Sequence, residues 1–425
     1  MKHIYFGIIC SMMMTSCDLF ESNNDFSDKV YVALQGLNKI GIVNINSGIV
    51  EEIDINYHSI DCSGFNNATD CANNGCMWHD MGGVNSHCMS HGDSHSNHAP
   101  HFISIDHSNK YWFVTTMMSG WVGRYSLNTG NLIDTIFVGD SPALMALDEN
   151  KQILYVSRMM LMADGQHGSQ TSFIQTIDYS DTEKMELKEP LDATIQGPHA
   201  VAINSDGSKL FTSTFEGDWL YKFMLEDNYI RYEVPLETGY SEDINDPYPT
   251  KRMKPVQAVL VEDSLLILSC SAGKWLDNSG IWHDIPGQVH LWNVSSQPME
   301  RKDTFLFNWD SRPWHLIESP TSNRVFVVLK GEDYDIYPDS DGVACLSYTS
   351  EGMINDEPEW ITRSENFEEL HGIDISDDGM TLFVSGFVDG KLHVLDASSG
   401  ALKKSIYLGP QLETQAAGVK YLRQN

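Results

Sequence analysis

Hydrophobic and polar positions recur along this chain in one repeated phrase. A short apolar stretch is followed by a turn rich in Asp, Asn, Ser and Gly, and then by a second apolar stretch that ends in small residues. Short apolar runs bounded by such turn residues are typical of β-strands. The phrase begins at Pro100, Pro142, Pro198, Pro255, His315 and His371, and its first strand alone appears once more from Ala417.

The starts lie roughly 40–60 residues apart, which is the period of a β-propeller blade. Two further apolar stretches follow the first pair, for example residues 121–127 and 131–139, so that each period holds four strands. Four-stranded blades that close into a ring leave few open sheet edges. The pattern therefore predicts an all-β propeller of four-stranded antiparallel blades.

The two ends of the chain predict how the ring closes. Residues 29–55 supply three strands without a leading one, and the stretch from Ala417 is a leading strand without its followers. Together they complete one blade, which is the usual latch of propellers. With the six other starts this predicts a seven-bladed β-propeller over residues 29–425.

Two copies of the phrase, residues 197–213 and 370–386, carry its sequence most clearly. Each has a first apolar strand, an Asp-Gly turn and a second apolar strand, and Gly suits the tight turn because it tolerates positive φ. This phrasing resembles the YVTN-repeat family of seven-bladed propellers. The resemblance covers nearly the whole mature chain outside residues 57–99. It implies the fold but no single function, because the scaffold hosts lactonases, electron-transfer subunits and binding modules.

Residues 1–17 predict export as a bacterial lipoprotein. The apolar stretch Ile4–Met14 is too short to span a bilayer but suits the h-region of a signal peptide. It runs into small residues before Cys17, which resemble a lipobox, so we expect Cys17 to be lipidated. Residues 18–28 then form an acidic linker. The predicted location is the cell envelope, on the periplasmic or cell-surface side; an ordinary signal peptide is the alternative.

Composition narrows the class of partner. The formal net charge of −32 argues against nucleic acid, since phosphate binding needs clustered Lys and Arg. No later stretch approaches the ~20 apolar residues that a membrane-spanning helix needs. We therefore expect a monomer that is held to the membrane by its N-terminal lipid. Its loop face would meet a small molecule or an envelope protein.

The first strand of each propeller blade lines the central channel. Aligning the repeated phrases gives Ala143, Val256 and Ala417 at the start of that strand in three blades and histidine in the other four. These histidines are His101, His199, His315 and His371. Neutral imidazole is a common ligand of copper and zinc, so we predict a copper or zinc site at the channel mouth. The alternative is that each histidine only hydrogen-bonds the backbone of a neighbouring blade.

Residues 57–99 interrupt the repeat between the first and second blades and are rich in Cys and His. A segment this short and polar cannot bury a core, so disulfides are expected, with a pairing that the sequence leaves open. A structural zinc site is the alternative, although the spacing lacks the Cys-x-x-Cys pairs typical of zinc. The cysteines are Cys62, Cys71, Cys76 and Cys88.

A histidine tract ends this insertion, and His91, His95 and His98 are further candidate metal ligands. His-rich tracts bind metals, and we expect the insertion to act as a lid over the channel mouth. A solvated linker is the alternative. Thioethers on neighbouring loops, such as those of Met117 and Met159, would favour copper, although methionines also serve as apolar packing.

Two weaker features concern calcium and sulfur. The loop with Asp333, Asp335, Asp339 and Asp341 holds enough carboxylates for calcium. It departs from the EF-hand spacing, so a solvated acidic loop is the favoured interpretation. Cys270 and Cys345 lie near predicted strand ends, and the sequence leaves open whether they pair or are buried thiols.

Three functions remain open at this point. A metal site would support redox or metal-assisted chemistry of a small molecule. A binding scaffold would present an aromatic surface to a protein or glycan. A lactonase would use Glu216, Asp218 or Glu318 as a general base. No nucleophile elbow, phosphate loop or haem-attachment motif is present, so whether the protein is an enzyme stays undecided. The tryptophans of the aromatic surface would be Trp121, Trp219, Trp275, Trp282 and Trp314.

Overall fold

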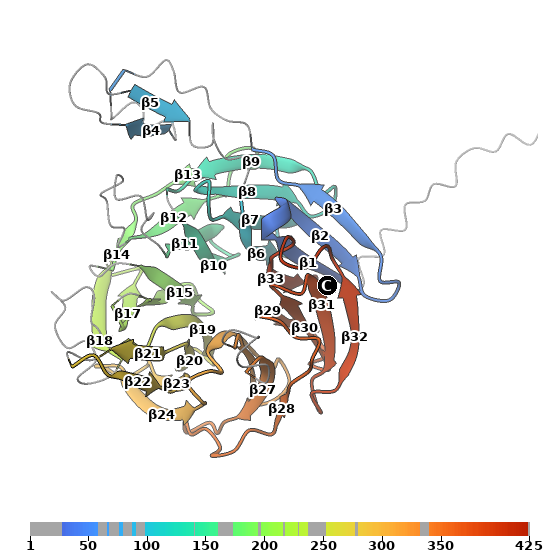
Figure 1. Cartoon of the computed structure of the whole chain (residues 1–425). Helices are drawn as coiled ribbons and strands as arrows, with labels where there is room; N and C mark the ends of the chain where they lie inside the picture. The colour runs from blue at the N-terminus through green and yellow to red at the C-terminus, as the bar shows by residue number, and fades with distance from the viewer. Residues whose placement is uncertain are drawn as a thin grey trace, which may run out of the picture.

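The computed structural model describes residues 28–57, 66–67, 76–79, 87–90, 98–139, 141–159, 173–193, 197–215, 217–227, 229–236, 252–276, 279–331 and 340–423. These residues form seven antiparallel sheets arranged as blades around a central channel (Figure 1). The all-β seven-bladed propeller expected from the repeated phrase is therefore confirmed. Each blade runs from an inner strand at the channel to an outer strand at the rim.

The strands of the first four blades are as follows, from the channel outward. Blade 1 holds β33 (Ala416–Tyr421), β1 (Lys29–Leu34), β2 (Lys39–Asn44) and β3 (Val50–Asp54). Blade 2 holds β6 (Pro100–Asp106), β7 (Tyr111–Thr116), β8 (Trp121–Ser126) and β9 (Leu132–Phe137). Blade 3 holds β10 (Pro142–Asp148), β11 (Ile153–Arg158), β12 (Phe173–Asp178) and the two short strands β13 (Glu186–Leu187) and β14 (Leu191–Asp192). Blade 4 holds β15 (Pro198–Ile203), β16 (Lys209–Thr214), β17 (Trp219–Met224) and β18 (Ile230–Pro235).

The other three blades follow the same order. Blade 5 holds β19 (Pro255–Val261), β20 (Leu265–Cys270), β23 (Gln288–Asn293) and β24 (Glu300–Leu306). Blade 6 holds β25 (Pro313–Glu318), β26 (Arg324–Leu329), β27 (Gly342–Ser347) and β28 (Trp360–Thr362). Blade 7 holds β29 (Leu370–Ile375), β30 (Thr381–Gly386), β31 (Lys391–Asp396) and β32 (Leu402–Tyr407). A short 3₁₀ helix, η1 (Gln35–Leu37), follows β1.

Two hairpins stand apart from the blades. The first, β21 (Gly273–Leu276) with β22 (Trp282–Ile285), is inserted within blade 5. The second, β4 (Cys76–His79) with β5 (His87–Ser90), belongs to the insertion before blade 2. Figure 1 shows β4 and β5 beyond the outer strands of the ring and not over the channel. The expectation that the insertion covers the channel mouth is therefore wrong for this hairpin. Within the described residues no helix is long and apolar enough to cross a membrane.

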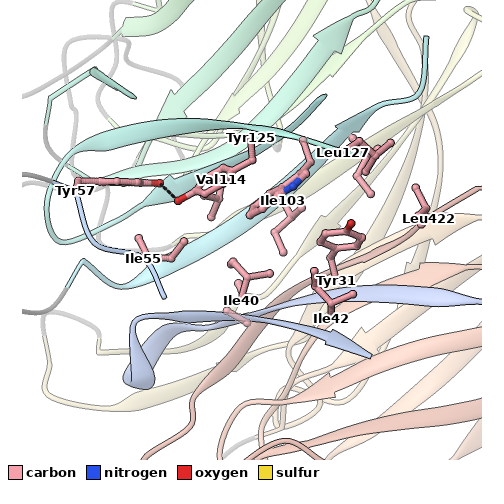
Figure 2. Close-up of a cluster of buried hydrophobic side chains, with 14 residues drawn as sticks. Tyr31, Ile40, Ile42, Ile55, Tyr57, Ile103, Val114, Tyr125, Leu127 and Leu422 are labelled. Atoms are coloured by element: carbon pink, nitrogen blue, oxygen red, sulfur yellow. Dashed lines mark hydrogen bonds between the residues drawn. The ribbon is translucent and has the colours of Figure 1, made fainter. Parts of the chain in front are cut away.

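The latch closes the ring through buried side chains. Strand β33 pairs with β1, and Leu422 N–H donates to Lys29 O at 2.9 Å, so the two ends of the propeller lie side by side. An apolar cluster then seals blade 1 against blade 2 (Figure 2). In it the fully buried Trp112 stacks on Tyr125 at 4.0 Å between ring centroids and lies 5.5 Å from Tyr31. Each aromatic contact of this kind adds about 0.5–1.5 kcal/mol to the burial energy.

Buried cations join two further pairs of blades. Arg124 in β8 donates through Nη1 to the carbonyl oxygens of Tyr179 and Asp181, at 3.1 and 2.6 Å. Lys222, at the matching position of β17, donates through Nζ to Val294 O at 3.0 Å and Ser296 O at 3.1 Å. The carbonyl oxygens belong to the next blade in each case. Without these bonds the carbonyl groups would be buried at the blade interface with no hydrogen-bond partner.

Candidate histidine site in the channel

Four histidines lie near the N-terminal ends of the channel-lining strands. His101, His199 and His371 are each the second residue of their inner strand, whereas His315 is the third residue of β25. The sequence alignment that gave all four one equivalent position is therefore wrong for His315, because Trp314 occupies that position. Strand pairing is irregular at this point in every one of these blades. His315 nevertheless lies beside His371.

Three of the four rings are in contact. The ring centroid of His371 lies 5.3 Å from that of His101 and 4.8 Å from that of His315, and both pairs are edge-to-face. All four side chains are buried, with 1–5% of the residue surface exposed. His199 lies in the same layer, where it packs against Phe215 at 5.8 Å between ring centroids. We call these four residues the histidine cluster.

The hydrogen bonds of the cluster leave several ring nitrogens without a partner. His101 Nδ1 lies 3.0 Å from Gln35 Oε1, and His199 Nδ1 donates to the carbonyl oxygen of Val256. Among the buried atoms, His199 Nε2, His315 Nε2 and His371 Nδ1 have no hydrogen-bond partner in the described part of the chain. An unpartnered buried nitrogen costs free energy, about 1–3 kcal/mol each, so its retention requires an explanation.

Burial keeps these imidazoles neutral. Burial, followed by the neighbouring charges of His199 and Lys330, lowers the pKa of His101 to about 3. Burial also lowers the pKa of His199 to about 4, and the bond to Val256 opposes this only in part. The pKa values of His315 and His371 fall well below the ordinary value, first because of burial and then because of the neighbouring histidines. Neutral imidazole is the form that binds metals.

An aromatic layer surrounds the cluster. Trp314 lies 5.7 Å from His371 and 6.4 Å from His315 between ring centroids, and Phe387 lies 5.4 Å from His371. The ammonium group of Lys330 sits 4.7 Å from the ring centroid of Trp314. This layer excludes water from the histidines and leaves one cation beside them.

The spacing of the rings can be compared with the spacing of two imidazoles on one metal ion. A metal–nitrogen distance of about 2.0–2.1 Å places each imidazole centroid about 3.2 Å from the ion, so two ligands at a tetrahedral angle have centroids about 5 Å apart. The two separations within the cluster, 5.3 and 4.8 Å, are close to this value, and they also lie in the range of about 4.5–7 Å that is ordinary for edge-to-face ring contacts. Within the described ranges, however, no group of three or more His, Cys, Asp or Glu side chains already has its donor atoms converging on one point. Metal binding by the histidine cluster would therefore require its rings to rotate.

None of the other predicted metal ligands is shown to join the histidine cluster. His98 does not join the cluster; its Nδ1 lies 3.0 Å from Ser119 Oγ and its ring packs on Tyr57 at 5.2 Å between centroids. His91 and His95 lie outside the described residues. Met117 and Met159 are partly buried in loops, and their sequence-based assignment as copper ligands stays a prediction.

The structure describes the bonding state of three cysteines. Cys88 is buried and disulfide-bonded, while the side chains of Cys62, Cys71 and Cys76 lie outside the described part, so the pairing stays a prediction. Cys270 and Cys345 are buried free thiols and do not pair with each other. Burial raises the pKa of Cys345 to about 12 and that of Cys270 well above its ordinary value, which leaves both thiols protonated.

Of the carboxylates proposed for calcium or lactone chemistry, the structure describes Asp341, Asp218 and Glu318. Asp341 is buried, and its Oδ1 accepts a hydrogen bond from the N–H of Leu370 at 3.3 Å, so it supports backbone; Asp333, Asp335 and Asp339 lie outside the described residues. Asp218 likewise accepts the N–H groups of Met253 and Lys254 at 2.6 and 3.0 Å. Glu216 is also outside the described residues.

Glu318 lies at the opposite end of β25 from the histidine cluster. It lines a cavity of about 620 Å³ that is formed by the later halves of the inner strands. Tyr348 Oη donates to it at 3.1 Å, and burial raises its pKa above the ordinary value. Phe102 lies between the two regions, since it lines the cavity and its ring is 6.2 Å from that of His315. Sequence reasoning missed this cavity because single strands do not reveal the width of the channel.

The tryptophans do not form one platform. Trp121 packs on Phe137 at 5.4 Å between centroids, Trp219 is buried in the core, and Trp314 belongs to the aromatic layer of the histidine cluster. Trp282, on the hairpin β21–β22, is 64% exposed. Most of the tryptophans proposed for an aromatic binding surface therefore serve as packing residues.

The buried Asp218 carboxyl predicts a pH-dependent stability. Burial raises its pKa to about 7, so the folded state favours the protonated form; this contribution is full below the unfolded pKa and is lost as pH rises through 7. Relative to Asp218→Asn, we expect the free energy of unfolding of the wild type to fall by about 2–3 kcal/mol between pH 5 and pH 8. Urea unfolding of both proteins at each pH measures this difference, and the comparison cancels the contribution of the buried histidines. An equal change in unfolding free energy between the two pH values in both proteins would contradict the prediction.

Comparison with known proteins supports the fold alone. No protein-family model and no curated protein sequence matches this chain. Among solved structures, a putative 6-phosphogluconolactonase from Bacteroides uniformis has a TM-score of 0.60 at 11% identity and covers 92% of this chain and 99% of its own. Another, from Bacteroides fragilis, has a TM-score of 0.59 at 12% identity and covers 93% and 98%. A functionally unknown protein from Desulfotomaculum acetoxidans has a TM-score of 0.61 at 9% identity and covers 94% and 100%. At these identities the comparisons show the fold alone, and the chain is a seven-bladed β-propeller.

Proposed function

We propose that this protein is a metal-binding propeller whose histidine cluster holds one copper or zinc ion in the channel. The observation that carries the proposal is the pair of ring separations around His371, 5.3 and 4.8 Å, in a buried and neutral cluster. Unpartnered nitrogens on three of the histidines add to it. An ion would use these nitrogens, which otherwise remain without any polar contact.

The hydrogen bonds behind the rings support the same proposal. A metal-binding histidine usually donates its second ring N–H to a carbonyl or carboxylate, which fixes its tautomer and orientation. Val256 O and Gln35 Oε1 lie on the Nδ1 side of His199 and His101, which leaves Nε2 of each for the ion. Bound copper would supply electron transfer, and bound zinc would supply Lewis acidity toward a small molecule.

Metal content tests the proposal directly. The chain from residue 18 onward, without a purification tag, would be incubated with copper or zinc, desalted and analysed by mass spectrometry. We expect about one ion per chain. His290→Ala is the matched control, since His290 is fully buried and its pKa is lowered to about 3, yet it lies in β23 outside the cluster. Failure of the wild type to retain either ion would leave a non-catalytic binding scaffold as the better account.

A lactonase is the second candidate, and one observation favours it. The cavity of about 620 Å³ holds the half-buried Glu318, whose raised pKa suits a general base. Two proteins with the same fold are described as putative 6-phosphogluconolactonases. If this activity resides here, metal-free protein should open lactones, and Glu318→Gln should abolish that opening while metal content is unchanged.

We further propose that Cys17 carries the lipid that holds the protein on the cell envelope. This rests on the apolar stretch and small residues that precede Cys17 in the sequence. In cells supplied with a labelled fatty acid, we expect the wild type to be labelled and to sediment with membranes. Cys17→Ser should lose the label; persistence of the label in that variant would contradict the proposal.

A further inference from the structure

The cavity of about 620 Å³ lies toward the end of the channel opposite the histidine cluster, and its walls are mostly apolar. Small-molecule sites are typically concavities of a few hundred Å³ in which a few polar groups orient the ligand against apolar walls. The cavity has this size and this lining. Blades 2–7 each contribute an apolar side chain from their inner strand, namely Phe102, Met145, Val201, Ala258, Ile317 and Ile375.

The basic groups that line this cavity leave little positive charge for a ligand. Lys420 Nζ lies 3.4 Å from Asp374 Oδ2, and Arg423 Nε lies 3.5 Å from Asp377 Oδ1, so both cations are already ion-paired. His107 also lines the cavity, and burial is the main cause that lowers its pKa, so its imidazole is uncharged at neutral pH. An anionic ligand would therefore have to compete with the carboxylates that hold these cations.

The two carboxylates that line the cavity have no cationic partner within the described part of the chain. Glu149 Oε2 accepts two hydrogen bonds from Ser108, through N–H at 3.2 Å and Oγ–H at 2.7 Å. Glu318 is half-buried and accepts one hydrogen bond through Oε1, from Tyr348 Oη at 3.1 Å. Burial, and then the like charge of Glu262, raises the pKa of Glu318, so both causes disfavour its ionised form. The uncompensated charge of the lining is therefore negative.

We propose that this cavity binds a small organic cation, a primary ammonium group on an apolar body, with the Glu318 carboxylate as its counter-ion. The ammonium group donates to Glu318, and the apolar body covers the wall that begins at the adjacent Ile317. Glu318 is a better counter-ion than Glu149, because its Oε2 accepts no hydrogen bond within the described residues. A hydrogen bond between two charged groups is among the strongest polar contacts in proteins. The proposed metal site plays no part in this binding.

Titration of the mature chain, residues 18–425, with benzylammonium tests the inference by ligand-observed NMR, which measures weak binding. Benzyl alcohol and benzoate carry the same ring with a neutral and an anionic group. We expect benzylammonium to bind at least about tenfold more tightly than either, because only it can form a charge-assisted hydrogen bond with Glu318. Glu318→Gln keeps the shape but removes the charge. It should weaken benzylammonium binding by about tenfold and benzyl alcohol binding by less than about twofold.

Two further variants separate binding from folding. Glu300→Gln removes an exposed carboxylate from the outer strand of blade 5 and should bind benzylammonium as the wild type does. Tyr348→Phe removes the hydrogen bond to Glu318 but keeps its charge, so it should retain binding. Thermal unfolding reports on the folding of each variant. Benzoate binding as tight as that of benzylammonium, an equal loss of benzylammonium and benzyl alcohol in Glu318→Gln, or no benzylammonium binding by the folded wild type would overturn the inference. The metal content of the wild type is measured separately, so the proposed function stands or falls on its own.

Discussion

Replacement of His371 by alanine is expected to lower the affinity for copper or zinc by more than about 100-fold. His371 contacts two other histidines of the cluster, so its removal takes away a ligand and the spacing of the others. Loss of a residue that merely orients a ligand already costs about 10–100-fold in metal affinity, so loss of a ligand should cost more. Competition with a chromophoric chelator measures the dissociation constant of each variant.

A graded series of variants makes this prediction specific. Gln35→Ala removes the side chain next to His101 Nδ1 and should cost about 10–100-fold, less than a ligand. His98→Ala alters a histidine that bonds to Ser119 instead of the cluster, and it should leave the affinity unchanged. His290→Ala removes a buried histidine outside the cluster and should likewise leave the metal affinity unchanged. Equal affinities for His371→Ala and the wild type would remove the cluster as the metal site.

Deletion of the C-terminal strand is expected to prevent folding of the whole propeller. Strand β33 supplies the inner edge of blade 1, and its Ala416, Ala417, Val419 and Tyr421 are all buried. Tyr421 also stacks on Phe383 at 5.3 Å, and its N–H donates to Asp374 Oδ2 at 2.7 Å. Without β33 the ring has an open edge, and a typical domain has only about 5–15 kcal/mol of stability to lose.

Circular dichroism and thermal unfolding of the chain ending at Gln415 test the latch. We expect no cooperative transition. The milder variant Tyr421→Ala should remain folded and lose roughly 3 kcal/mol, as is usual for a large buried side chain. A circular permutant that joins Leu422 to Lys29 through a short linker should retain the wild-type transition, because these residues are hydrogen-bonded at 2.9 Å. A cooperative transition in the truncated chain would show that six blades suffice.

The sequence by itself determined the fold and the location of the histidines in it. The repeated phrase places β-strands by local rules: apolar runs form strands, and Asp-Gly pairs such as Asp206-Gly207 form the tight turns between them. Because every blade obeys the same rules, the period predicted the ring, and the incomplete phrases at the two ends predicted the latch. His101, His199 and His371 follow from this alignment, since position in the phrase sets position along the channel.

Only the tertiary structure decided which side chains meet. His315 lies one residue later in its strand than the others, yet its ring centroid lies 4.8 Å from that of His371. Lys330, which directly follows β26, has no sequence feature that links it to the cluster, yet its ammonium group lies 4.7 Å from the ring centroid of Trp314 beside the cluster. His98 follows the histidine tract but turns to Ser119. Contacts between residues far apart in sequence depend on how whole blades pack, and local patterns of polarity carry no information about that packing.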